Sequence, residues 1–190
     1  AIYARYGVAA TYIGHPLADR IALKPDIAAA RNQIGLHAVH ALAVLPGSRI
    51  SEITRLLPVF LDSAERLRDR LPDLHLVIPA ANQQCRVAIQ SQLAMRQWEN
   101  VTVLDGQAQA AMISCDAVLL ASGTAALEAM LCKKPMVVAY KISALTYFIV
   151  RTFKMMKVTQ FSLPNALAGY AMVPELMQDD CNPDAIAAAM

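Results

Sequence analysis

One short segment of this sequence carries a turn suited to phosphate chemistry. In residues 41–49 an aliphatic run ends in Pro46-Gly47-Ser48-Arg49, and a helical pattern follows from about residue 51. A helix that begins after such a turn directs free N–H groups and the positive end of its dipole at one spot. The Arg49 guanidinium can hold a phosphate there through two parallel hydrogen bonds. The segment predicts a phosphate site built from Gly47, Ser48 and Arg49.

The alternative for this first turn is an ordinary strand-to-helix connection. Glycine and serine are common at such positions, and either Ser48 or Ser51 could cap the helix that follows. The turn is not a Walker loop, because no Gly-Lys-Ser/Thr follows the glycine. This absence argues against nucleoside-triphosphate hydrolysis.

A second turn of the same design lies in residues 116–130. Gly123 allows a ligand to approach the backbone, and Ser122 and Thr124 supply hydroxyl groups at the expected helix start. Glu128 follows Thr124 by four residues, so both lie on one helix face. A carboxylate there can accept hydrogen bonds from both hydroxyls of a ribose. A solvated helix glutamate is the alternative for Glu128, but the two turns together favour a nucleotide.

Both turns must be held by the elements around them, and the apolar pattern predicts an α/β fold. The strands lack polar alternation, which is typical of a parallel sheet covered by helices on both faces. The expected class is a doubly wound, mostly parallel, Rossmann-like sheet that binds ligands at the carboxyl ends of its strands. We expect strands over residues 42–45, 74–78, 101–104, 116–121 and 136–140, with helices over residues 51–71, 83–98, 108–113 and 123–131.

The remaining segments suggest how the chain is organised. Residues 1–25 are interpreted as an entry segment from a preceding domain, and residues 26–190 as one Rossmann-like domain that is truncated at its C-terminal end. A helix is expected over residues 26–34, with Gly35 as its stop signal. Residues 161–165 are expected to form a loop, because they contain a proline and an asparagine. The chain starts at Ala1 and ends within a helical pattern, so we expect a piece of a longer protein.

Composition excludes several classes of protein. Of the 190 residues 56% are hydrophobic, yet no apolar run reaches the roughly 18 residues of a membrane span. No secretory leader is recognisable. The four cysteines are scattered without Cys-x-x-Cys spacing, which argues against a zinc site or a disulfide framework and fits a reducing cytoplasm. The formal net charge of +2 is too small to indicate nucleic-acid binding.

Residues 144–157 combine bulky apolar side chains with three basic ones, Arg151, Lys154 and Lys157. Such a segment could lie at a membrane surface or beside the acyl chains of a lipid. It could equally form a core helix whose basic side chains extend outward to water.

Four motifs together resemble the lipid-A-disaccharide synthase family. They are Leu45-Pro46-Gly47-Ser48-Arg49 with Glu52, the stretch from Ala121 to Glu128, Ser162-Leu163-Pro164-Asn165, and Ile13-Gly14-His15-Pro16. They occur in order through nearly the whole chain. The resemblance implies the C-terminal, donor-binding half of a GT-B glycosyltransferase, in which two Rossmann-like domains face each other across a cleft.

The resemblance also implies the reaction and its partners. UDP-2,3-diacylglucosamine would react with 2,3-diacylglucosamine 1-phosphate, a lipid acceptor, to give the β-1,6-linked disaccharide 1-phosphate and UDP, with inversion at the anomeric carbon. Such chemistry needs a base for the acceptor hydroxyl and a stabiliser for the departing diphosphate. The base is expected in the absent N-terminal half. A homodimer formed by exchange of C-terminal elements is possible in the family, and truncation after Met190 is expected to weaken it. Because both implied substrates are lipids, we hypothesise that the basic apolar segment 144–157 attaches the protein peripherally to the cytoplasmic face of the inner membrane.

Site residues follow from the same resemblance. Ser48, Arg49 and the helix start after Gly123 are assigned to the diphosphate, Glu128 to the ribose, and Asn165 to the donor sugar or diphosphate. Arg49 and Asn165 are the expected catalytic residues, although Asn165 could simply form a turn. His15 belongs to one of the four family motifs, but it could equally be an interdomain structural residue. Asp105-Gly106 is placed near the uracil by its strand-end position alone.

No cofactor is expected, and metal independence is predicted because the chain contains no Asp-x-Asp motif; Asp179-Asp180 is a weak substitute. Two other functions stay open. One is a different UDP-sugar enzyme of this architecture, such as a UDP-N-acetylglucosamine 2-epimerase or a peptidoglycan glycosyltransferase. The other is a non-catalytic UDP-binding module that acts through a partner.

Overall fold

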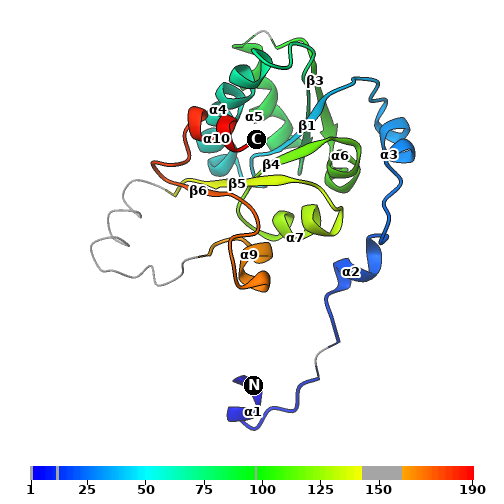
Figure 1. The fold of residues 1–190 in the computed structure, drawn as a ribbon, viewed down its shortest axis with the longest axis vertical. Coiled ribbons are helices and arrows are strands. Elements are labelled where there is room, and N and C mark those ends of the chain that lie inside the picture. Colours follow the sequence, from blue (N-terminus) through cyan, green and yellow to red (C-terminus); the bar gives the residue numbers. More distant parts are fainter. Residues whose placement is uncertain (1, 12, 97, 143–159) are drawn as a thin grey trace.

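The fold was analysed in a computed structural model that describes residues 2–11, 13–96, 98–142 and 160–190. A single parallel sheet forms its centre (Figure 1). The strands lie in the order β3-β2-β1-β4-β5-β6, which is the doubly wound Rossmann order. All five pairings between neighbouring strands are parallel. Their bounds are β1 Ala41–Leu45, β2 His75–Ala80, β3 Val101–Asp105, β4 Ala117–Ala121, β5 Met136–Tyr140 and β6 Glu175–Met177.

The predicted fold class is confirmed, and the first five strands differ from their predicted bounds by at most two residues at an end. The sequence analysis missed β6. This strand has only three residues, all of them half-buried, and it pairs with β5 at the edge of the sheet. So short a segment contains no periodicity from which a strand could be recognised.

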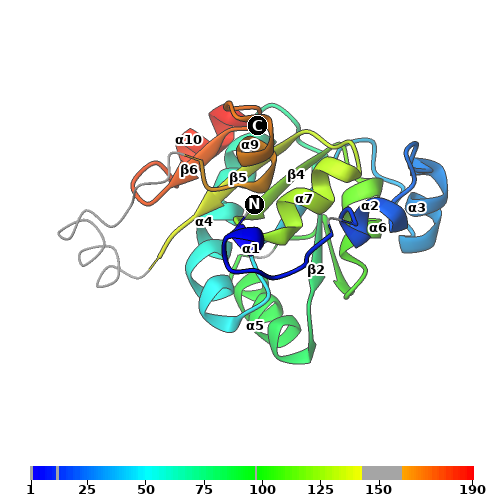
Figure 2. The same cartoon turned by 90° about the horizontal axis from the view of Figure 1, so that it is seen from below.

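Helices cover both faces of the sheet. The helices α4, α5 and α10 pack on one face, and α3, α6 and α7 pack on the other (Figures 1 and 2). Alternate residues of each central strand therefore enter opposite cores, which explains why these strands are apolar throughout. The bounds are α1 Ile2–Arg5, α2 Pro16–Arg20, α3 Ile27–Ile34, α4 Ile50–Arg68, α5 Gln83–Ala94, α6 Ala108–Ser114, α7 Thr124–Leu131, α9 Leu163–Ala168 and α10 Pro183–Ala189.

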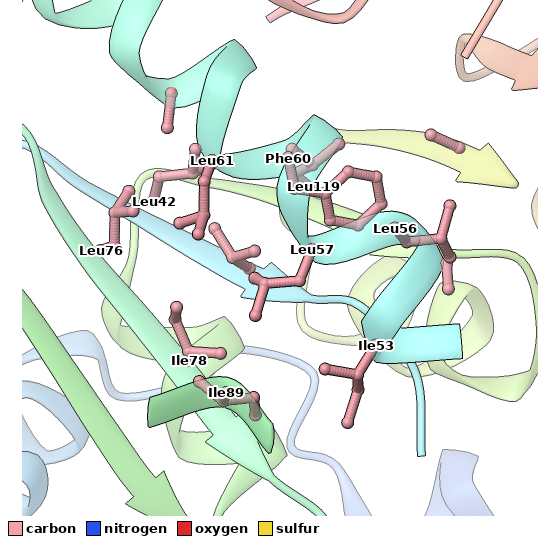
Figure 3. Close-up of a cluster of buried hydrophobic side chains, with 14 of the residues drawn as sticks. Leu42, Ile53, Leu56, Leu57, Phe60, Leu61, Leu76, Ile78, Ile89 and Leu119 are labelled. Atoms are coloured by element: carbon pink, nitrogen blue, oxygen red, sulfur yellow. The ribbon is translucent and has the colours of Figure 1, made fainter. Parts of the chain in front are cut away.

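Helix α4 is the main anchor of the first core. Its inward face carries Ile53, Leu57 and Phe60, spaced three or four residues apart and completely buried against the sheet (Figure 3). Burial of each such side chain contributes about 1.5–3 kcal/mol. The beginning of α4 is therefore fixed relative to the end of β1.

Three of the predicted elements are wrong in detail. Helices α4 and α5 end at Arg68 and Ala94, several residues before their predicted ends. Residues 161–165 are not a loop, because α9 begins within them. Ser162 is the N-cap of α9, and its Oγ accepts a hydrogen bond from the N–H of Asn165. Pro164 is tolerated in the first turn, where its missing N–H would have had no partner in the helix.

The entry segment lies apart from the sheet. Helix α1 is separated from the body of the domain in Figure 1, and Ile21 is the first of the described residues that enters a core cluster.

All four cysteines are buried, and burial raises the pKa of the Cys115 thiol to about 12. No helix in the described residues is both long and apolar enough to cross a bilayer. The basic apolar segment 144–157 lies outside the described residues.

Candidate functional site

The two predicted phosphate turns meet at the centre of the sheet. Strands β1 and β4 are neighbours, with Leu45 opposite Leu120. Helix α4 leaves β1 toward one face, and α7 leaves β4 toward the other. The two turns therefore face each other at the point where the order of the strands reverses. In open α/β sheets this switch point is where ligands bind.

A cavity of about 360 Å³ lies between the turns. Its volume falls within the range of small-molecule sites. Six of the eight predicted substrate-binding residues line it, namely Gly47, Ser48, Arg49, Ser122, Gly123 and Thr124. The ends of β2 and β3 complete the wall with Ala80, Ala81, Gly106 and Ala108. The structure thus brings both turns, which are about 75 residues apart in the sequence, to one cavity.

The first turn is organised around Glu52, which belongs to α4. Its Oε2 accepts hydrogen bonds from the backbone N–H of Ser48 at 3.0 Å and of Arg49 at 3.3 Å. Its Oε1 lies 3.1 Å from Nη1 of Arg49. The prediction that Ser48 or Ser51 caps the helix is wrong: Arg49 takes the N-cap position, and Glu52 satisfies its N–H from the third helical position.

This arrangement explains why the turn contains Gly47. The residue has φ +122°, which L side chains rarely adopt. A Cβ at this position would lie 2.3 Å from Oε2 of Glu52 and 2.6 Å from its Cβ. Below the turn, the buried Sγ of Cys85 donates a hydrogen bond to the carbonyl of Ser48 at 3.3 Å. The backbone N–H groups of Ser48 and Arg49, predicted to face a phosphate, are thus bound by a carboxylate.

The second turn is organised differently. In the described residues no side-chain carboxylate binds the N–H groups of Gly123, Thr124 or Ala125, where α7 begins. The turn is instead held from a distant segment, because Oγ of Ser122 donates a hydrogen bond to the carbonyl of Phe161 at 3.1 Å. Gly123, Thr124 and Ala125 line the cavity, so the positive end of the α7 dipole lies at its wall.

Glu128 and Asn165 are not among the residues that line the cavity. Glu128 is half-buried on α7, one turn beyond Thr124. The side chain of Asn165 is only 2% exposed. Its Nδ2 donates to the carbonyl of Val173 and to Glu175, and its Oδ1 accepts from the N–H groups of Met172 and Val173. In this structure Asn165 therefore fastens the loop between α9 and β6.

The sequence analysis missed Glu175, the first residue of β6, which accepts a hydrogen bond from Asn165 at the end of that loop. Its carboxylate accepts hydrogen bonds from the N–H groups of Phe161 and Ser162, each at 2.8 Å, and from Oγ of Ser162 at 2.5 Å. Burial raises the pKa of Glu175, but the hydrogen bonds from Ser162, Phe161 and Asn165 outweigh burial, and the net pKa lies below its ordinary value. The sequence held one signal of this role, because Glu175 is a single acidic residue in an otherwise apolar segment.

The remaining candidates have local partners. Gly106 lines the cavity, whereas Asp105 points to Arg86, with 2.9 Å between their charged atoms. His15 caps α2 by accepting a hydrogen bond from the N–H of Leu17. In the part of the chain that the structure describes, no group of three or more His, Cys, Asp or Glu residues could hold a metal ion.

Comparison with known proteins identifies the family. The sequence model of lipid-A-disaccharide synthetase matches residues 1–190, the whole of this chain. The chain belongs to this family. The four motifs of the sequence analysis therefore indicated the family correctly.

Curated relatives show how much of the family's length is present. The chain is 52% identical to the lipid-A-disaccharide synthase of Xylella fastidiosa strain M23, with 100% of this chain matching 50% of that protein. It is 50% identical to the synthase of Xanthomonas campestris pv. campestris strain 8004, and there it covers 44% of the relative. The chain thus spans about half the length of the curated relatives that it matches.

Solved structures agree on the fold. Escherichia coli ADP-heptose lipopolysaccharide heptosyltransferase II superposes with a TM-score of 0.60 at 15% identity, over 86% of this chain and 49% of that one. A UDP-forming trehalose-phosphate synthase from Burkholderia xenovorans gives a TM-score of 0.54 at 13% identity, over 91% of this chain and 40% of that one. At these identities the likeness establishes the Rossmann-like fold alone.

Proposed function

We propose that this chain is the UDP-sugar-binding half of an inverting glycosyltransferase of lipid A biosynthesis. The observation that carries the proposal is the cavity between two strand-end turns in a chain whose whole length matches the family. The donor would be UDP-2,3-diacylglucosamine and the acceptor 2,3-diacylglucosamine 1-phosphate. The products would be the lipid A disaccharide 1-phosphate and UDP.

The site supports distinct roles for its residues. The open N–H groups after Gly123 and the guanidinium of Arg49 would receive the diphosphate and stabilise its charge as it departs. Glu128, one turn along α7, would accept the ribose hydroxyls. The base that takes the proton of the acceptor hydroxyl would come from the half of the protein that precedes this chain. Asn165 would act on the donor through the loop that it fastens, because its amide is already bound within that loop.

Three further features belong to the same proposal. Binding would not need a metal ion, since the helix dipole and Arg49 supply the positive charge. The complete enzyme would attach peripherally to the cytoplasmic face of the inner membrane, through the basic segment 144–157. A homodimer would be compatible with the family. A non-catalytic UDP-binding module remains the alternative, and it predicts nucleotide binding without disaccharide synthesis when the missing half is added.

Calorimetric titration tests the donor site. We expect UDP, but not ADP, to bind this chain, and to bind equally well in EDTA and in magnesium. Glu128→Ala should weaken UDP binding at least tenfold, or about 1.4 kcal/mol, because the ribose loses its acceptor. Glu99→Ala is the matched control, since Glu99 is exposed and lies away from the cavity lining. Equal affinity for UDP and ADP, or no UDP binding, would contradict the proposed site.

A further inference from the structure

The position of Glu52 creates a conflict within the proposed site. A carboxylate lines a cavity that is proposed to bind a diphosphate. It is bound to two backbone N–H groups and to a guanidinium, all of which could otherwise serve a phosphate. Either the diphosphate displaces Glu52, or Glu52 remains in place and the diphosphate uses other donors.

The burial of Glu52 favours its remaining in place. Its side chain is 15% exposed, and its oxygens bond to three donors on two neighbouring residues. The carboxylate also fits the turn closely. A Cβ at Gly47 would overlap Oε2 of Glu52, so the absence of a side chain at this glycine provides the space in which Oε2 lies. Displacement would also leave the N-cap N–H of α4 without its partner.

Glu52 uses only part of the N–H donors of the Arg49 guanidinium. The Arg49 side chain is 77% exposed, and Glu52 is bound through one nitrogen, Nη1. A guanidinium carries five N–H donors in a planar fork, so the fork can contact Glu52 on one side and an anion on another. A long side chain of this kind loses rotamer entropy when it is ordered. An ion pair already made with Glu52 removes part of that loss before the ligand arrives.

We propose that Glu52 is a positioning residue for diphosphate recognition, which rests on the proposed function. It retains the N–H groups of Ser48 and Arg49 and orients the Arg49 guanidinium toward the cavity. The diphosphate is then bound by that guanidinium and by the open N–H groups of the second turn. The first turn thus contributes a side chain to the anion, and the second contributes backbone.

The test combines a structural and a binding readout. In wild-type protein, the Nε–Hε NMR signal of Arg49 should show restricted motion, and the amides of Ser48 and Arg49 should be protected from hydrogen exchange. Glu52→Ala should abolish both effects and weaken UDP binding about tenfold, while binding of uridine, which lacks phosphate, should be unchanged. Glu52→Gln retains an acceptor oxygen and should restore amide protection and part of the UDP affinity.

A matched variant separates positioning from loss of a helix cap. Asp26→Ala removes the carboxylate that caps α3 by accepting from the N–H of Ala29, and Asp26 does not line the cavity. It should lower the melting temperature as Glu52→Ala does without changing the affinity for UDP. Tighter UDP binding by both Glu52 variants would overturn the proposal, because it would show that the carboxylate competes with the diphosphate. Unchanged motion of Arg49 in Glu52→Ala would overturn it as well.

The two proposals can fail separately. If wild-type protein does not bind UDP, the proposal of a donor site is contradicted. The motion of Arg49 then still decides whether Glu52 positions its guanidinium.

Discussion

The two turns that face the cavity resemble each other in sequence but are stabilised in opposite ways. In the first turn the N–H groups are bound by a carboxylate three and four residues along the same helix, Glu52. In the second turn no carboxylate among the described residues binds the N–H groups. The turn is instead held by a remote brace, the segment of residues 160–175, because Oγ of Ser122 donates to the carbonyl of Phe161. A turn that satisfies its own donors is rigid without a ligand, whereas a turn that leaves them open needs support from elsewhere. Under the proposed function, the first turn would be a fixed platform for Arg49 and the second would receive the anion.

The largest expected effect comes from adding one methyl group to each turn. Gly47→Ala should destabilise the protein by about 2–4 kcal/mol, since it combines backbone strain with a collision against Glu52. Gly123→Ala should cost less, about 1–3 kcal/mol, because at φ +156° it meets strain but no atom within 4 Å. Urea denaturation of both variants measures the difference. Equal losses would show that Glu52 does not occupy the space beside Gly47.

A smaller effect should appear when the remote brace is weakened through Glu175. The folded-state pKa of this carboxyl lies below its ordinary value, so its contribution to stability is complete above the unfolded pKa of about 4.3 and is lost as the pH falls through the folded pKa. Glu175→Gln should therefore lower the free energy of unfolding by about 1–3 kcal/mol at pH 7. The gap from wild type should close as the pH falls below about 4.

Denaturation of both proteins across pH 3 to 7 checks this dependence. Glu99→Gln is the matched control, because Glu99 is exposed and should show little change at any pH. A gap between wild type and Glu175→Gln that stayed constant down to pH 3 would mean that the charge of Glu175 does not stabilise the loop.

The smallest effect is expected for the link between the brace and the second turn. Ser122→Ala removes one hydrogen bond, to the carbonyl of Phe161, and should cost about 1 kcal/mol. Amide exchange near residues 160–169 should quicken, while the amides of Ser48 and Arg49 should remain protected by Glu52. Faster exchange in both turns would contradict their independence.

The sequence was informative where a pattern is local. The aliphatic runs predicted five of the six strands, because strands buried on both faces must be apolar. The same runs placed Gly47, Gly106 and Gly123 at strand ends, and all three line one cavity. Recognition of the family also rested on contiguous motifs, and the match over the whole chain confirmed it.

Predictions failed where a partner lies outside the pattern. The Ser162-Leu163-Pro164-Asn165 motif was expected to be a loop. Its proline lies instead in the first turn of α9, and its asparagine is buried against the 172–175 segment. The sequence identifies Asn165 as a polar side chain that needs hydrogen-bond partners. It does not identify the partners, because a buried amide binds whichever groups the fold places beside it.

Sequence alone determined that this chain forms a doubly wound α/β domain of the lipid-A-disaccharide synthetase family, with two glycine turns at strand ends. Hydrophobic pattern and glycine positions are local properties, and they suffice for the fold class and the turns. The family followed from the resemblance of four contiguous motifs, which the match over the whole chain confirmed. Only the tertiary structure decided that the turns meet at one cavity, that Glu52 occupies the donors of the first, and that Glu175 fastens the segment bracing the second. Those facts depend on strand order and on contacts between distant residues, because the free energy of a hydrogen bond depends on which groups the fold brings within reach.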